Sequence, residues 1–208
     1  MVTGERPPTN TIYTIGYSGF TMDTFLERLC SCGVNVLVDV RSSPYSAYRP
    51  EFNKEPLSQK LKQNRIIYRH YGIEFGARRE ETELYSEDGR VDFEKTMHSE
   101  AFLRGIERVL SGIGLGYTFA LMCAEKEPVS CHRGILVSRV FKEHGCNVIH
   151  LLPGDREMSH ETLEEQLLNI HFPNRGQMSM FDAADDKELL QLAYQKQNEV
   201  IGYRRENV

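Results

Sequence analysis

The sequence predicts a single α/β domain, built on a mainly parallel sheet with helices on both faces and ending in a C-terminal helical tail. Short β-branched, apolar runs alternate with segments of helical periodicity, which is typical of this class. These runs are almost uninterrupted, as expected for strands covered on both faces. With 40% apolar and 26% charged residues, the composition excludes wholesale disorder. We expect a polar tail over 1–10, an α/β domain over 11–170, and a linker, short peptide motif and helix over 171–208.

The first structural unit has the order strand, helix, strand. A β-branched run over 11–15 is followed by a helix that Thr21 can cap and Gly33 can end. A second apolar strand occupies 36–40. Such a βαβ unit implies a right-handed crossover in a parallel sheet. The helix is predicted from apolar residues on one face, at Met22, Phe25, Leu26 and Leu29.

Later elements follow the same alternation, although 72–96 has no clear period. Ser99 can cap a helix, and Gly112, Gly114 and Gly116 are predicted to separate this helix from the next strand. Gly145 closes another helix. We expect further helices over 56–63, 99–110, 135–141, 159–169 and from 185 onward, and strands over 65–68, 117–122 and 147–152.

Charge and cysteine content limit the function classes. A net charge of −5 argues against a globally basic nucleic-acid coat protein but leaves room for a local basic face. No apolar run reaches the ~18 residues of a membrane span, and the first ten residues lack the apolar core of a signal peptide. We therefore expect a cytoplasmic protein with no membrane partner. An odd number of cysteines favours free thiols over disulfides: Cys30, Cys32, Cys123, Cys131 and Cys146.

Reactive side chains are concentrated where the predicted strands end. Parallel strands present their carboxyl ends at one edge of the sheet, where ligands of open α/β sheets bind. We predict a functional site there, with the arginines holding an oxyanion or phosphate and a thiol or carboxylate performing the covalent or acid–base step. The proposed catalytic residues are Asp39, Arg41, Cys123, Glu125, Cys131, His132 and Arg133, with Tyr17 and Ser18 binding substrate.

Each of these assignments has a structural alternative. Cys123 is either a nucleophile at a helix N-terminus or a small buried apolar residue. Cys131 is a resolving thiol or a metal ligand, but with His132 the two cysteines supply at most three ligands, so we expect no metal and no cofactor. Asp39 and Arg41 either act on an anion or form an ion pair that fixes their loop, and Glu125 is an alternative base.

A basic, aromatic segment precedes an acidic one. Cations for phosphate beside aromatic rings for bases are typical of a single-strand-binding surface. Residues 80–94 reverse the sign, so the two stretches could instead pair with each other. The predicted nucleic-acid contacts are Arg65, Arg69, Arg78 and Arg79, beside Tyr68, Tyr71 and Phe75.

Three motifs together resemble the domain of unknown function 488 family. They are Thr14–Ser18 (TIGYS), Val38–Pro44 (VDVRSSP), and above all Cys123-Ala124-Glu125 followed by Cys131-His132-Arg133. The likeness covers about residues 12–154, with His150 and His160 near positions that the family pattern favours. It implies a single domain with one shared site, but no established reaction or substrate.

Two weaker likenesses suggest a rival activity and a partner. The Asp-Val-Arg segment after one strand and a cysteine ending a later strand resemble rhodanese-type folds, which carry sulfur as a cysteine persulfide. Neither cysteine, however, opens a loop of the rhodanese kind. Residues 177–181 (QMSMF) look like the peptide by which bacterial replication and repair proteins bind the sliding clamp, with Gln177, Met180 and Phe181 as contacts. Alternatively, these side chains pin the tail to the domain.

The leading hypothesis is a cytoplasmic α/β protein whose strand-end site acts on a nucleic acid or nucleotide-like anion, with a role in DNA repair through the tail peptide. The alternatives are a rhodanese-like sulfurtransferase and a non-catalytic nucleic-acid-binding adaptor. The sequence leaves open whether the protein is an enzyme, and its oligomeric state.

Overall fold

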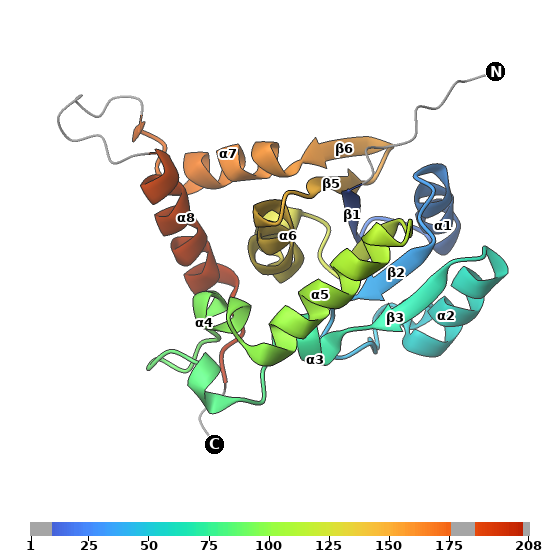
Figure 1. Cartoon of the computed structure of the whole chain (residues 1–208), viewed down its shortest axis with the longest axis horizontal. Helices are drawn as coiled ribbons and strands as arrows, with labels where there is room; N and C mark the ends of the chain where they lie inside the picture. The colour runs from blue at the N-terminus through green and yellow to red at the C-terminus, as the bar shows by residue number, and fades with distance from the viewer. Residues whose placement is uncertain (1–9, 176–185, 206–208) are drawn as a thin grey trace.

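The computed structural model describes residues 10–175 and 186–205, and these form an α/β fold around one six-stranded sheet (Figure 1). The strand order is β3-β2-β4-β1-β5-β6, parallel except for β6, which runs antiparallel to β5. The predicted fold class is confirmed. The strands are β1 (Thr11–Gly16), β2 (Val36–Asp39), β3 (Ile67–His70), β4 (Phe119–Cys123), β5 (Asn147–Leu152) and β6 (Arg156–Ser159).

Helices connect the strands as the periodicity predicts, and the segment without a clear period holds only short ones. Thr21 and Ser99 cap their helices as expected. The α-helices are α1 (Met22–Ser31), α2 (Lys54–Gln63), α3 (Gly72–Phe75), α4 (Phe93–Met97), α5 (Glu100–Gly114), α6 (Arg139–Glu143), α7 (His160–His171) and α8 (Asp186–Ile201). Shorter 3₁₀ turns are η1 (Pro50–Phe52), η2 (Thr82–Leu84) and η3 (Pro128–Ser130), and a π-helical turn, η4 (Arg133–Ser138), leads into α6.

Two departures from the prediction have physical reasons. Helix α5 continues through Gly112 and Gly114, where the prediction ended it. A β-carbon at Gly112 would lie 2.4 Å from the Phe119 ring, so this glycine serves close packing against β4 and does not end the helix. Strand β6 was not expected, because its residues do not alternate between apolar and polar.

The sheet divides the core into two layers. One face packs against α5, η4, α6, α7 and α8, and the other against η1, α1 and α2. Neighbouring residues of a strand point to opposite faces. In β2, therefore, Val36 and Val38 belong to the first layer and Leu37 to the second.

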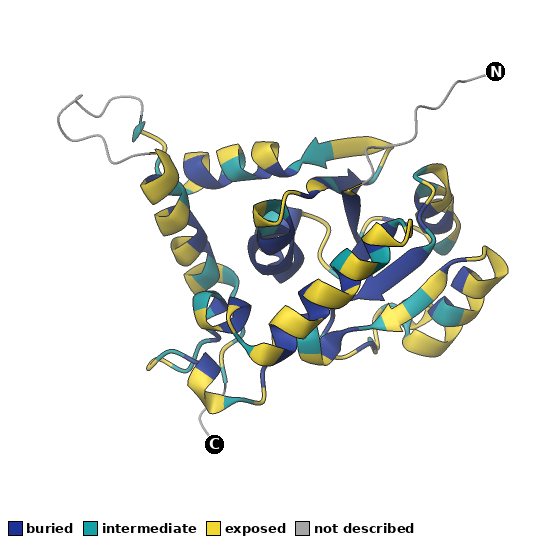
Figure 2. Ribbon diagram, viewed as in Figure 1, coloured by how far each residue is buried: buried dark blue, intermediate teal, exposed yellow. Residues whose placement is uncertain are grey.

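Helix α8, expected as a tail, packs closely on the domain. Leu189, Ala193 and Tyr194 are buried in the first core layer. Figure 2 shows this helix exposed on its outer side and buried where it faces α7 and α4. The Gln197 side chain joins it to the domain by donating to the Val129 carbonyl, 2.8 Å away.

The carboxyl end of β4 lies at the centre of the sheet edge, because β4 sits between β2 and β1. Gly16 of β1 is in register with Cys123 of β4. A β-carbon at Gly16 would lie 1.7 Å from the Glu125 carbonyl oxygen, so only glycine lets the segment after β4 pass this close. The backbone N–H of Tyr17 donates to the Cys123 carbonyl and that of Ser18 to the Ala124 carbonyl. The chain after β4 is thereby fixed beside the chain after β1.

Candidate metal centre

Four side chains from two segments converge just beyond β4. The Sγ atoms of Cys123 and Cys131 lie 3.0 and 2.9 Å from Oε2 of Glu125. Nδ1 of His132 lies 3.8 Å from the first sulfur and 4.0 Å from the second. These ligand atoms are all within 4.8 Å of one another. The group therefore presents two sulfurs, one carboxylate oxygen and one imidazole nitrogen to a common point.

The His132 ring is oriented by the backbone after β2. Its Nε2 lies 3.0 Å from the Val40 carbonyl oxygen, which can only accept a hydrogen bond, so Nε2 carries the proton. In the neutral ring this leaves the Nδ1 lone pair facing the two sulfurs. A carbonyl that fixes the second nitrogen in this way is usual for metal-binding histidines.

Arg133 is fully buried behind the cluster and holds its loop. Its Nη1 donates to the Glu125 carbonyl at 2.5 Å and its Nη2 to the Lys126 carbonyl at 2.9 Å. Within the described residues no carboxylate pairs with this guanidinium, and Nε has no hydrogen-bond partner. Because a buried charge needs compensation, anionic groups in the adjacent cluster are its natural counter-charge.

The two thiols ionise differently. Burial opposes ionisation of Cys131, yet the Cys123 thiol, Arg133 and His132 outweigh it and hold the pKa of Cys131 well below its ordinary value. Burial together with Cys131 and Glu125 raises the pKa of Cys123. Cys131 is thus the thiol that is ready to act as a thiolate.

The donor set fits a tetrahedral divalent ion. Ligand atoms of a tetrahedral zinc site stand about 3.3–3.8 Å apart, from bond lengths of about 2.0–2.3 Å. The four distances measured from the two sulfurs to oxygen and nitrogen bracket these values, at 2.9–4.0 Å. Sulfur and nitrogen donors favour zinc over magnesium or calcium.

Glu125 is a candidate metal ligand to which the sequence analysis gave a different role. The sequence admitted at most three ligands, and Glu125 was predicted to act as a base. A signal was present in the spacing, since Cys123 and Glu125 are two residues apart where a predicted strand ends, and side chains two apart along an extended chain point to the same side. Their distance from Cys131 and His132 depends on the fold and could not be derived from spacing.

Asp39 and Arg41 form a separate network with each other. Nε and Nη2 of Arg41 donate to the two carboxylate oxygens of Asp39 at 2.8 and 2.5 Å, and the Tyr68 hydroxyl donates to Oδ2 at 2.7 Å. Asp39 shares the strand face of Leu37, in the second core layer, whereas Cys123 lies in the first. These side chains thus lie across the sheet from the thiols, and the Val40 carbonyl is what connects this strand end to His132.

The residues predicted to bind substrate differ in how far they are buried. Tyr17 is buried and stacks on Phe52, with ring centroids 4.7 Å apart, while Ser18 is half-buried beside the Ala124 carbonyl. Arg79 is buried and its Nη1 donates to the Ile73 and Glu74 carbonyls, so it serves the fold.

The three other predicted arginines are exposed but do not form one surface. Arg65 and Arg69 line a groove of about 340 Å³ at the edge strand β3, together with Lys62 and Tyr68. Arg78 stacks on Tyr203, 4.8 Å from the ring centroid, and lines another cavity with Glu80 and Glu81. The basic segment is therefore divided between two places. The peptide with Gln177, Met180 and Phe181 lies outside the described residues.

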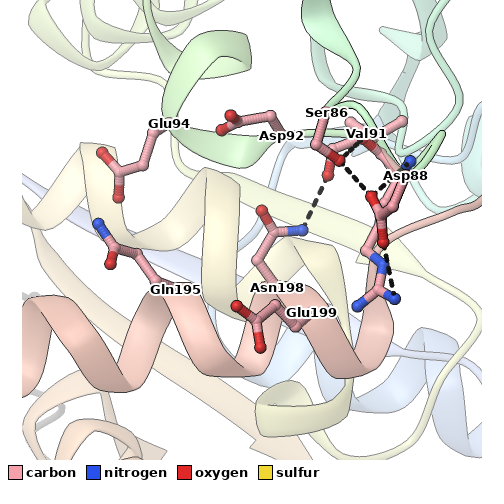
Figure 3. Close-up of a pocket in the computed structure, with 9 residues that line it drawn as sticks. Ser86, Asp88, Val91, Asp92, Glu94, Gln195, Asn198 and Glu199 are labelled. Atoms are coloured by element: carbon pink, nitrogen blue, oxygen red, sulfur yellow. Dashed lines mark hydrogen bonds and ion pairs between the residues drawn. The ribbon is translucent and has the colours of Figure 1, made fainter.

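A cavity of about 550 Å³ lies elsewhere, between α8 and residues 86–94 (Figure 3). Its charged groups are already partly used: Asp88 pairs with Arg90, and Glu94 pairs with Arg139, at 3.3 and 2.6 Å. Asn198 donates to the Val91 carbonyl. This cavity offers no metal-binding or nucleophilic group comparable to the thiol cluster.

The fold and the cluster define a mainly parallel α/β protein with a thiol, carboxylate and imidazole centre at the end of its central strand. The family model described as "Domain of unknown function DUF488" matches residues 21–140. The chain belongs to this uncharacterised family. No curated protein and no solved structure gave a significant match. No helix in the described ranges is long and apolar enough to cross a membrane.

Proposed function

We propose that this protein is a metal-dependent enzyme that acts on a phosphate group of a nucleic acid or nucleotide-like anion, with a divalent ion held by Cys123, Glu125, Cys131 and His132. The convergence of these four ligand atoms within 4.8 Å is the observation that carries the proposal. A zinc-type ion there would act as a Lewis acid on a phosphoryl oxygen.

Charge balance supports a divalent ion. Two thiolates and a carboxylate contribute three negative charges, and the neutral imidazole contributes none. A divalent ion and the buried guanidinium of Arg133 together contribute three positive charges. The loaded centre is then neutral as a unit, and Arg133 is no longer an uncompensated buried cation.

A neighbouring loop offers contacts for a nucleic acid. Tyr48 is 94% exposed, which is unusual for a large aromatic residue. Arg49 joins its loop to the turn after β1 by donating to the Phe20 carbonyl at 2.7 Å. That same turn is hydrogen-bonded to the segment carrying Glu125, through Ser18 and Ala124. An exposed ring and an arginine, connected in this way to the segment that carries Glu125, suit a stacked base and its phosphate.

Elemental analysis with matched variants tests the centre. Purified wild type is expected to hold about one divalent ion per chain, since four-ligand thiolate sites bind tightly. Cys123→Ser and Cys131→Ser are expected to lose it, whereas Cys146→Ser, at another buried cysteine, should keep it. Equal metal content in all four proteins would contradict the proposal.

An activity assay tests the substrate. The metal-loaded protein is incubated with single-stranded and duplex oligonucleotides, and products are separated on denaturing gels. We expect product with wild type and Cys146→Ser but not with the two ligand variants. Failure to change any oligonucleotide or mononucleotide, while metal remains bound, would remove the substrate part of the proposal.

Sulfur transfer is the second candidate, favoured by the lowered pKa of Cys131 beside a second thiol. This reaction requires a cysteine thiolate that is not bound to a metal and can carry the transferred sulfur as a persulfide. It predicts thiocyanate formation from thiosulfate and cyanide, and a protein mass increased by one sulfur atom. Thiolates bound to a metal would not carry a persulfide, so the metal analysis separates the two proposals.

A non-catalytic adaptor is the third candidate, for which the groove beside β3 provides the surface. Neutralising Arg65 and Arg69 together should weaken oligonucleotide binding and reduce its salt dependence. Arg79 is not suitable for this test, because it is buried in contacts that serve the fold. Unchanged binding in the double variant would exclude this groove.

The tail peptide remains a proposal from sequence alone. We propose that Gln177, Met180 and Phe181 bind a bacterial sliding clamp, and that the protein works in the cytoplasm, where thiols stay reduced. Phe181→Ala is expected to abolish clamp binding in a pull-down with purified clamp, and unchanged binding would exclude this motif.

A further inference from the structure

We propose that Glu125 is an exchangeable ligand of this centre, which leaves the ion so that a phosphate oxygen can take its place. The inference rests on the proposed metal centre and adds how that centre becomes open to substrate. A site closed by four protein ligands is typical of a structural role, whereas a catalytic site keeps one position for water or substrate.

The four ligands differ sharply in exposure. Cys123 and Cys131 are 2% exposed and His132 is 8% exposed, while Glu125 is exposed at the surface. Solvent and solutes therefore reach the cluster from the carboxylate side. The three buried ligands can hold an ion in the manner of a catalytic cysteine and histidine site with its fourth position open.

The ligands also differ in how their positions are fixed. Cys123 is the last residue of β4, and the Cys131 carbonyl accepts hydrogen bonds from the N–H groups of Gly134 and Ile135. The His132 ring is held by the Val40 carbonyl. Among the described side chains, the Glu125 carboxylate is hydrogen-bonded to the two thiols alone, which would share the ion with it.

The backbone at Glu125 is, in contrast, firmly held. Arg133 binds the carbonyl oxygens of Glu125 and Lys126, and Gly16 packs against the same segment. Exchange therefore needs only rotation about the side-chain bonds of Glu125, with no opening of the loop. A rotation of this kind at an exposed residue is fast compared with catalytic turnover.

The exchange conserves charge and needs no other reactant. The bond between the ion and the Glu125 oxygen breaks, and a bond to a phosphate oxygen forms. One anionic oxygen replaces another, and no electron or proton is transferred. The freed carboxylate stays tethered to the held backbone, next to the site it left.

Cobalt substitution of the full chain tests the exchange. Thiolate-bound cobalt absorbs in the near ultraviolet, and its visible bands report on coordination. Inorganic phosphate is expected to shift the visible bands of the wild-type protein saturably, with the near-ultraviolet band retained. Glu125→Ala should retain cobalt and respond at a phosphate concentration at least about tenfold lower, because a tethered competitor is gone.

Glu127→Ala is the matched control, since Glu127 is an exposed carboxylate two residues along that pairs with Lys126. It should behave as wild type. The inference is overturned if phosphate leaves the wild-type visible bands unchanged, if phosphate strips the cobalt, or if Glu125→Ala cannot hold it. Absence of any thiolate–cobalt band in wild type would instead remove the metal centre, and with it the proposed function.

Discussion

At the residue scale, the surroundings of Arg133 distinguish it from the other arginines of the site. It carries its charge into the core, donates to two carbonyls of the ligand loop and has no carboxylate partner among the described residues. Arg41, which is also buried, is instead neutralised by Asp39. Arg41 therefore carries a charge that is already paired, whereas the charge of Arg133 is available to balance the anionic groups of the centre.

Replacing Arg133 should weaken metal binding. In Arg133→Gln the ligand loop loses a bidentate donor and the centre loses its balancing charge, so we expect affinity to fall by about 10- to 100-fold, as for other residues that support metal ligands. Competition with a chromophoric chelator measures this. Arg139→Gln is the control, because Arg139 pairs with Glu94 and Glu143, and equal affinity in both variants would contradict the role of Arg133.

Tyr48 should matter for binding and not for folding. Its ring is almost fully exposed, so Tyr48→Ala removes a stacking surface without opening a cavity. We expect weaker binding of a single-stranded oligonucleotide by about 1–3 kcal/mol, with Tyr48→Phe close to wild type and both melting temperatures unchanged. Fluorescence anisotropy measures the affinity. If Tyr48→Ala binds as tightly as wild type, the strand does not stack there.

Sequence reasoning selected the thiols, Glu125 and His132 because their residue types stand out after a buried strand. It could not place Asp39, because whether a strand-end side chain joins one core layer or the other depends on register with its neighbours. Nor could it separate Arg79 from Arg78, although one is buried and the other exposed. Both arginines belong to the same basic stretch, so the composition of the sequence cannot show which of them is buried.

At the element scale, a chain of buried hydrogen bonds joins the sheet to α7 and α8. Glu164 accepts from the Tyr194 hydroxyl at 3.1 Å, so that hydroxyl must accept from Nε2 of His160, 2.9 Å away. Nδ1 of His160 then accepts from Nε2 of His150 at 3.1 Å, and Nδ1 of His150 from Thr14 at 2.7 Å. Both imidazoles are therefore neutral in the folded protein.

This chain should make stability depend on pH. Burial lowers the pKa of His160 to about 3 and that of His150 well below its usual range. Because the folded values lie below the unfolded value near 6.5, stability is fully present above about pH 6.5 and is lost as the pH falls toward 3. For His160 alone we expect a loss of about 2 kcal/mol between pH 7 and pH 5.

Urea unfolding at a series of pH values measures this slope. His160→Asn should lower stability at pH 7 and flatten the slope, whereas His98→Asn, at an exposed histidine, should leave both unchanged. An unchanged slope in His160→Asn would show that this histidine is not held neutral by burial.

At the scale of the whole molecule, the order of buried strands and amphipathic helices was sufficient to predict the class of fold. The predicted strands 11–15 and 147–152 match β1 and β5 closely because buried parallel strands are nearly continuous runs of apolar and β-branched residues. The antiparallel β6 and the docking of α8 depend on contacts between distant segments, such as Gln197 with Val129. Local periodicity carries no information about such contacts.

The central claim is that the fold brings Cys123, Glu125, Cys131 and His132 around one ion. Anomalous diffraction from crystals of the purified protein, recorded on both sides of the absorption edge of the bound metal, tests it most directly. We predict one anomalous peak about 2.0–2.3 Å from both sulfurs and from Nδ1 of His132. A map with no peak there, or with a disulfide joining Cys123 to Cys131, would contradict the account.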